Sequence, residues 1–352
     1  MNRKALEDMF LAPGVSPWKT FLLEVHADGE PEEFLRDAFG NAAIRETEDR
    51  FLHSVVTPEL EFTVDHLDSR FWSFHSNGSA AQMNAYLKAA VARRRDLDFV
   101  WLPSAHLRQI RRGTPPNWIK TEFRGQMALP LDEVQELAVT VRGRPAQDLL
   151  DVISGNSDFP YAISVSQLEL AIADPDLGVV REAVNRFALF VAKGDSFALH
   201  QNVVQSVATR YRRLVEAAEH VALGIDAMDH ADRDEGGGRL VGGPIELTFS
   251  RPLLELDRFV DNLLSSREPF RLWGIVGHPS GDYREVEAVD LHVGQRLRLE
   301  VSSEMVRIHL RRGGCGNTVA RLVSNLQHHV DGGLTASDPE IQSQLAMQPI
   351  AA

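Results

Sequence analysis

The sequence lacks the features of several common protein classes. It has one cysteine, Cys315, so no disulfide can form within the chain. No apolar run approaches the roughly 20 residues that a membrane-spanning helix needs. Residues 1–10 show no apolar stretch followed by a small-residue cleavage site, so we expect no export signal. These absences predict a cytoplasmic protein without a membrane partner.

Local signatures of catalysis and of metal binding are also missing. The chain has 13 histidines, but none of them stands in an HExxH motif, and one cysteine cannot form a CxxC pair. The glycine-rich turn 313–316 is followed by neither GK[ST] nor a dinucleotide-binding pattern. We therefore predict no metal site and no cofactor, and we favour a non-catalytic protein without excluding an enzyme.

The net charge of −13 excludes a protein that coats nucleic acid nonspecifically, because neutralising phosphates needs clustered Lys and Arg. The charge is uneven along the chain. Residues 226–235 hold five acids against one arginine, whereas 296–321 holds six arginines against Glu300 and Glu304. The overall charge therefore leaves a local anion site open.

Three stretches share one layout, a strand-like run that ends in glycine and precedes a helical pattern: 71–78, 187–194 and 306–313. Ser79, Ser196 and Asn317 follow these glycines, and such residues cap helices by accepting a hydrogen bond from a free backbone N–H. The glycines are about 116 and 119 residues apart. Similar spacing in three places indicates an internal repeat.

A second shared pattern lies upstream of each of these helices. It consists of a strand-like run and then a proline that opens an amphipathic helix. The strands are 21–25, 137–141 and 245–249, and the prolines are Pro31, Pro145 and Pro252. Proline is favoured in the first helical turn because its missing N–H would be unpaired there. Each unit thus reads as strand, helix, further strands and a closing helix.

These patterns predict an α+β fold made of three tandem repeats, each an antiparallel sheet covered on one face by two helices. The predicted organisation is module 1 (15–96), a connector (97–135), module 2 (136–223), an acidic and glycine-rich linker (224–243), module 3 (244–331) and a flexible tail (332–352).

The alternation is clearest in the third unit. Residues 296–301 and 306–311 alternate between apolar and polar side chains, with Ser302-Ser303 as the turn between them. Period-two alternation indicates a sheet with one buried and one solvated face. The residues expected in the core are Leu297, Leu299, Val301, Val306, Ile308 and Leu310.

The order of elements resembles that of the TATA-binding-protein-like fold, in which two such units form a saddle. The resemblance covers element order over about 240 residues and includes no diagnostic motif. It implies an open sheet face of the kind with which that family reads the DNA minor groove. No residue here can be matched to that family's DNA-contacting positions, and the fold also occurs in proteins that bind no DNA.

The first candidate site is the polar face of the third sheet. Its residues are Arg296, Arg298, Arg307, His309, Arg311 and Arg312. Guanidinium groups suit the bidentate binding of phosphate or carboxylate. The alternative is a solvated face that is partly paired with Glu300 and Glu304.

The second candidate is the glycine-rich helix start with Gly314, Cys315 and Asn317. Free backbone N–H groups and the helix dipole favour an anion there, and the same position would lower the pKa of the Cys315 thiol. The alternative is a tight turn with a helix cap. A catalytic Cys315 is a weaker candidate, because no histidine partner can be placed from sequence.

Three functions remain open. The first is a non-catalytic binding or scaffold protein that acts through a protein partner or through copies of itself. The second is a nucleic-acid- or anion-binding subunit that uses module 3. The third is an enzyme with a cleft between modules that involves Cys315.

Overall fold

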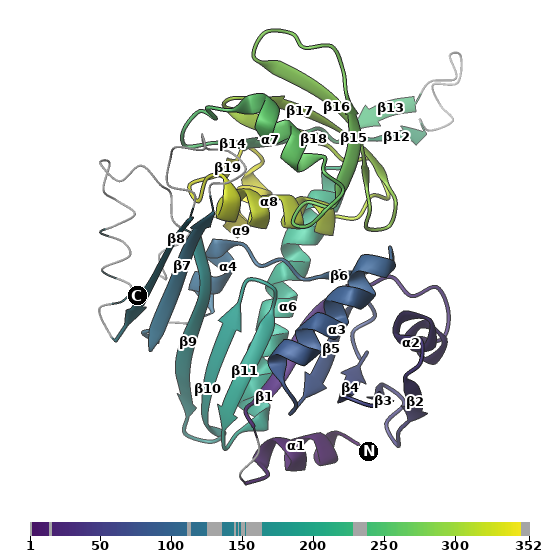
Figure 1. Ribbon diagram of the computed structural model, residues 1–352, viewed down its shortest axis with the longest axis vertical. Coiled ribbons are helices and arrows are strands. Elements are labelled where there is room, and N and C mark those ends of the chain that lie inside the picture. Colours follow the sequence, from purple (N-terminus) through teal and green to yellow (C-terminus); the bar gives the residue numbers. More distant parts are fainter. Residues whose placement is uncertain are drawn as a thin grey trace.

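The computed structural model describes residues 2–13, 16–110, 114–124, 136–143, 146, 148, 152, 164–227 and 238–345. The helix predicted after Pro145, most of the acidic stretch and the last residues of the tail lie largely or wholly outside these ranges. The described chain combines helices with antiparallel sheets, which confirms the α+β class (Figure 1). None of the described helices is both long enough and apolar enough to cross a bilayer.

The first module follows the predicted order, a strand, a helix, four strands and a helix. Its elements are β1 (Trp18–Val25), α2 (Pro31–Phe39), β2 (Ala43–Glu46), β3 (Leu52–Val56), β4 (Glu61–Asp65), β5 (Phe71–Ser76) and α3 (Ala80–Arg93). Helix α1 (Arg3–Leu11) precedes them. Pro31 opens α2 and Ser79 caps α3, both as the sequence predicts.

The first and second modules share one eleven-stranded sheet with the order β2-β3-β4-β5-β1-β11-β10-β9-β7-β8, and β6 pairs with β1 as well. The further elements are β6 (Leu97–Phe99), α4 (Ser104–Gln109), β7 (Trp118–Arg124), β8 (Glu136–Arg142), β9 (Ser164–Asp174), β10 (Gly178–Asn185), β11 (Leu189–Gly194) and α6 (Phe197–His220). Pairing of β1 with β11 joins the modules. The predicted connector thus contributes two strands and a helix.

The third module forms a separate six-stranded sheet with the order β15-β16-β17-β18-β14-β19. Its elements are β14 (Ile245–Thr248), α7 (Leu256–Leu263), β15 (Leu272–Val276), β16 (Tyr283–Asp290), β17 (Arg296–Ser302), β18 (Met305–His309) and α8 (Asn317–His329). All six predicted core residues are buried. Helix α7 begins four residues after Pro252, because Leu253 N–H donates to the Ser303 carbonyl (2.7 Å) and ties this segment to the β17–β18 turn.

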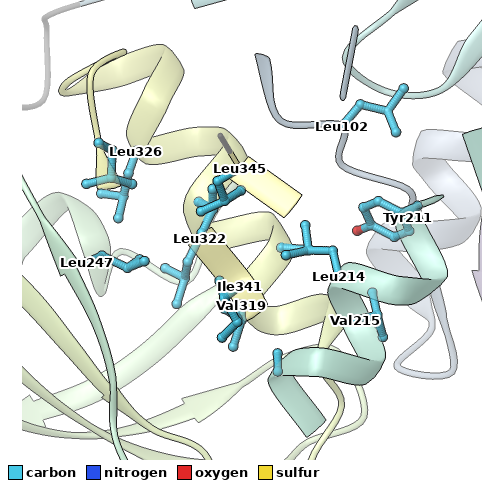
Figure 2. Packing of buried hydrophobic residues seen from close by; sticks show 14 of the residues in the cluster. Leu102, Tyr211, Leu214, Val215, Leu247, Val319, Leu322, Leu326, Ile341 and Leu345 are labelled. Carbon is cyan, nitrogen blue, oxygen red and sulfur yellow. The ribbon is translucent and has the colours of Figure 1, made fainter. Parts of the chain in front are cut away.

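The two sheets meet through helices. Figure 1 shows α6 reaching from the large sheet up to α8 of the third module. Figure 2 shows the contact, where Leu214 of α6 lies toward Leu322 and Val319 of α8, and Tyr211 of α6 lies on the side of Leu102. These side chains belong to one buried cluster that continues from the second module into the third. Modules 2 and 3 are therefore packed against each other through a continuous apolar core.

The segments expected to be flexible are partly ordered. Residues 224–243 contain a hairpin of β12 (Gly224–Ala227) and β13 (Gly238–Val241). The predicted tail adds β19 (Thr335–Ala336) beside β14 and then forms α9 (Pro339–Leu345). Ile341 and Leu345 of α9 are buried. Apolar burial therefore fixes residues 335–345 that polar composition alone suggested were frayed.

A chain of buried polar groups crosses the shared sheet beneath α6. Glu182 Oε2 lies 2.9 Å from His200 Nδ1, and His200 Nε2 lies 2.8 Å from the Thr20 hydroxyl. The same hydroxyl lies 2.9 Å from His75 Nδ1. Burial lowers the pKa of His75 to about 3, and burial also lowers the pKa of His106 in α4 to about 3. Both histidines are therefore neutral in the folded protein near neutral pH.

These two histidines predict how stability depends on pH. The ordinary pKa is 6.5, so between pH 6.5 and about 3 the unfolded chain binds more protons than the folded one. The contribution of these histidines to the free energy of unfolding should be fully present above about pH 6.5. It should fall as the pH decreases below that value, by up to about 1.4 kcal/mol per pH unit for each histidine. Urea unfolding at several pH values measures how steeply the free energy of unfolding falls with pH. In His106→Leu this slope should be smaller by the equivalent of one proton. His278→Leu, on an exposed loop, should keep the wild-type slope, and equal slopes in all three proteins would refute the expectation.

Candidate functional site

The polar face of the third sheet is partly paired with its own carboxylates. Arg298 pairs with Glu285 (2.8 Å), and Arg307 pairs with Glu246 (2.7 Å) and Glu300 (2.8 Å). His309 lies 3.0 Å from Glu300. Arg296, Arg311 and Arg312 are also exposed around this sheet. The predicted pairing with Glu300 is present, and Glu246 and Glu285 pair with arginines of the same face as well.

The glycine-rich start of α8 holds an anion from the chain itself. Gly316 N–H donates to Glu219 Oε1 (2.9 Å), and Glu219 comes from the end of α6. Gly314 is packed so closely that a Cβ would lie 2.7 Å from the Arg311 carbonyl oxygen. Asn317 is fully buried and accepts a hydrogen bond from the Tyr211 hydroxyl. The anion expected from the helix dipole is thus an internal carboxylate. Gly316 and not Asn317 is the N-cap of α8, so the predicted cap at Asn317 is wrong, and its side chain bonds to Tyr211 instead.

Cys315 does not have the reactive environment that its position predicted. The side chain is buried, and burial together with the nearby Glu24 carboxylate raises the pKa of the thiol well above its ordinary value, although Arg70 acts in the opposite direction. The start of α8 does not lower the thiol pKa, because Glu219 already accepts a hydrogen bond there and the Glu24 carboxylate lies against the sulfur. The prediction of a lowered thiol pKa is therefore wrong.

Cys315 instead belongs to a cluster of four metal-ligating side chains. One donor atom from each of Glu24, His26, His292 and Cys315 lies within 4.8 Å of the other three. Glu24 is in β1 and His26 follows that strand, whereas His292 lies in the turn after β16 and Cys315 just before α8. The cluster therefore lies at the junction of the first and third modules, which we call the junction site.

The spacing of the donors fits a shared metal ion. Cys315 Sγ lies 3.6 Å from His26 Nε2 and 3.5 Å from Glu24 Oε1, and His26 Nε2 lies 3.5 Å from the same Oε1. Two donors of one tetrahedral zinc ion lie roughly 3.3–3.6 Å apart, given bonds of about 2.0–2.3 Å. The His292 Nε2 to Glu24 Oε2 separation of 2.9 Å is shorter because these two groups form a hydrogen bond, which ligation would replace.

Arg70 compensates the negative charge of the site. Its Nε donates to Glu24 Oε1 (2.6 Å), its Nη2 donates to Glu219 Oε1 (2.6 Å), and Nη2 lies 3.5 Å from Cys315 Sγ. Burial alone would raise the pKa of Glu24, but His26, His292 and Arg70 hold it well below its ordinary value. Glu24 is therefore an anion, although it is fully buried.

A second layer of buried ions supports the site. Glu24 of β1 is directly opposite Asp98 of β6 in the antiparallel ladder. Arg321 of α8 donates to both Asp98 and Asp290, and Arg271 donates to Asp98 (3.0 Å). Burial would raise the pKa of Asp98, but Arg321, His292 and Arg271 lower it below its ordinary value. The junction of the two modules is thus held by fully desolvated ion pairs.

The arrangement does not resemble a thiol catalytic relay. Such a relay needs one imidazole nitrogen toward the sulfur and the other toward an acid. Here the same nitrogen, His26 Nε2, faces both the Cys315 sulfur and the Glu24 carboxylate. Nitrogen, oxygen and sulfur donors that converge on one point suit a cation between them.

Sequence reasoning did not single out Glu24, His26, Arg70 or His292. The ligands come from parts of the chain up to 291 residues apart, so no local motif spacing contains them. One signal was present. Glu24 interrupts an apolar strand, and a charge buried in a strand interior is costly unless it is paired or binds a metal.

The ion pairs at the junction predict a large effect of Arg321→Met. Removal of this guanidinium leaves Asp98 and Asp290 buried with less compensation and should cost about 3–5 kcal/mol of unfolding free energy. Lys88→Met is the control, because Lys88 and Glu268 are about half exposed and their pair (3.3 Å) should contribute less than about 1 kcal/mol. Urea unfolding measures both, and equal losses would contradict this account.

Comparisons with known proteins cover almost the whole chain. The model of a family described as MJECL33-like protein matches residues 2–344. An uncharacterized protein, MJECL33, from Methanocaldococcus jannaschii is 24% identical over 367 residues, which cover 93% of this chain and 87% of that protein. The description of the family and that of the relative name no activity.

Proposed function

We propose that the chain, which belongs to the MJECL33-like protein family, is a metal-binding protein whose ion joins its first and third modules. The observation that carries the proposal is the convergence of four donor atoms within 4.8 Å from three separate segments. Nitrogen and sulfur donors beside a carboxylate favour zinc or a similar divalent transition metal.

The protein is proposed to use this ion for structure. Structural zinc sites take all four ligands from the protein, whereas catalytic sites keep one position for water. Glu24, His292 and Cys315 are buried, and one third of the His26 side chain is exposed. An enzyme with an inter-module cleft that involves Cys315 remains the alternative. It would be favoured if the metal ion bound water as its fourth ligand instead of Glu24. A reducing compartment such as the cytoplasm suits a thiolate ligand.

Metal binding can be tested on the full-length chain after chelator treatment. One equivalent of Co²⁺ should produce a thiolate-to-metal charge-transfer band, and Zn²⁺ should displace it. Cys315→Ser should lose the band and weaken binding at this site. Free Zn²⁺ at a hundredfold excess over its Kd should stabilise the wild type by about 2.7 kcal/mol.

The matched control for this experiment is His309→Ala, which removes a partly buried histidine of the same module outside the junction site. It should retain the charge-transfer band at the wild-type Co²⁺ affinity, whereas His292→Ala, which keeps the thiolate but removes one ligand, should need more Co²⁺ to develop the band. The proposal fails if folded wild-type protein gives no thiolate band at saturating Co²⁺, or if the band survives in Cys315→Ser.

We further propose that the protein acts without catalysis, by binding a protein partner. The partner that we favour is a second copy of the same chain. Strand β15 is an edge of the third sheet, and its Trp273 (51%) and Ile275 (65%) are exposed. An open apolar edge favours pairing with another strand. Antiparallel pairing about Gly274 would place Trp273 opposite Ile275 of the other copy, and aromatic residues pair well with β-branched ones.

Analytical ultracentrifugation tests self-association. The wild type should form a dimer, and Trp273→Glu combined with Ile275→Lys should be monomeric. Leu67→Glu is the control, since Leu67 is similarly exposed (54%) but lies in the first module. A wild type that stays monomeric at all concentrations would remove this part of the proposal, and a heterologous protein partner would then take its place.

The resemblance to TATA-binding-protein-like repeats stays a proposal at the level of topology. It is supported by the strand order, because β2-β3-β4-β5-β1 and β15-β16-β17-β18-β14 have the same sequence of elements. Nucleic-acid binding through module 3 ranks below protein binding, since carboxylates pair with Arg298 and Arg307. Salt-dependent binding of an oligonucleotide, lost when both arginines are changed to glutamate, would reverse that order.

A further inference from the structure

A second cluster of potential ligands lies in the first module and shares no residue with the junction site. A surface pocket of about 630 Å³ is bounded by the start of α2, the turn between β2 and β3, and the residue after β4. Five acids line it together with one arginine, Arg50. These acids are Glu30, Glu32, Glu46, Glu48 and Asp49.

Two histidines of this pocket have ring nitrogens without a partner. His53 is 7% exposed and its Nδ1 makes no hydrogen bond, and Nε2 of His66 is likewise buried without one. Their ring centroids are 5.1 Å apart. A buried polar atom that lacks a partner costs free energy, about 1–3 kcal/mol, so such atoms call for an explanation.

Strand pairing brings a carboxylate to the same place. Glu46 of β2 is directly opposite His53 of β3 in the antiparallel ladder, so both side chains extend from the same face. His66 N–H bonds to the Phe51 carbonyl (3.0 Å), which fixes the second imidazole beside the same end of β3. The backbone therefore brings two imidazoles and one carboxylate to the same end of β3, and a bound ion would require their side chains to turn toward one point, because their donor atoms do not converge as those of the junction site do.

We propose that this pocket binds a divalent transition-metal ion through His53 and His66, with Glu46 as the carboxylate ligand. Imidazole and carboxylate together select ions such as zinc or nickel rather than calcium or magnesium, which prefer oxygen alone. Arg3 pairs with Asp49 (3.1 Å) and Arg36 with Glu32, and the remaining acids of the rim attract the cation and offset its charge. An organic amine would also suit the rim, but it would not need two imidazole nitrogens.

The experiment uses the full-length Cys315→Ser variant, in which the junction site is weakened. Titration with Co²⁺ should show binding with ligand-field bands and without a thiolate charge-transfer band. His53→Ala and His66→Gln should each lower the affinity about tenfold or more, since even residues that only orient ligands contribute about 10–100-fold. Glu46→Gln should weaken binding as well.

Two controls keep the result interpretable. Glu59→Gln removes an exposed acid of the same module outside the pocket and should leave the affinity unchanged. Circular dichroism establishes that each variant is folded, and a loss of binding counts only for folded protein.

The outcomes separate this inference from the proposed function. Unchanged Co²⁺ affinity in folded His53→Ala and His66→Gln overturns the second site, whatever happens at Cys315. A wild type with no thiolate band, but with binding that depends on His53, overturns the junction site and keeps the second one. Competition by a polyamine with no metal binding would show that the pocket takes an organic cation, and would also overturn the inference.

Discussion

The fold depends on how the charge of the buried Glu24 carboxylate is compensated. This group is fully desolvated in the central strand β1, and an isolated charge there would cost more than the whole stability of a domain. Arg70 and His292 come from different modules to offset it. Their positions require the first and third modules to meet with one geometry, so the junction is specified by charge as well as by apolar packing.

The neighbouring ions extend the same constraint. Asp98 and Asp290 belong to different sheets, and Arg321 of α8 bonds to both. A buried pair of this kind adds little net stability over an apolar contact, but removal of one partner is costly. The network therefore acts on specificity, because any other packing of the modules would leave at least one charge unpaired.

The local sequence was sufficient to predict the core of the third module, because strict alternation identifies its buried residues. It also predicted Ser79 and Ser196 as helix caps of the first and second modules, from residue type and position. Its failures have a physical cause. Pro252 was expected to open a helix, but long-range hydrogen bonds tie this segment to the β17–β18 turn. The ordered tail depends on burial of Ile341 against distant elements, which polar composition does not reveal.

The junction site was beyond prediction for a related reason. His292 is 268 residues from Glu24, so the site exists only as tertiary structure. This separation has a consequence for synthesis on the ribosome. Strand β1 cannot complete its pairing until β11 emerges, and its acidic residue meets its last partners only after the third module is made. Strand β1 thus leaves the ribosome well before β11 and Cys315, the partners that complete its pairing and surround its carboxylate.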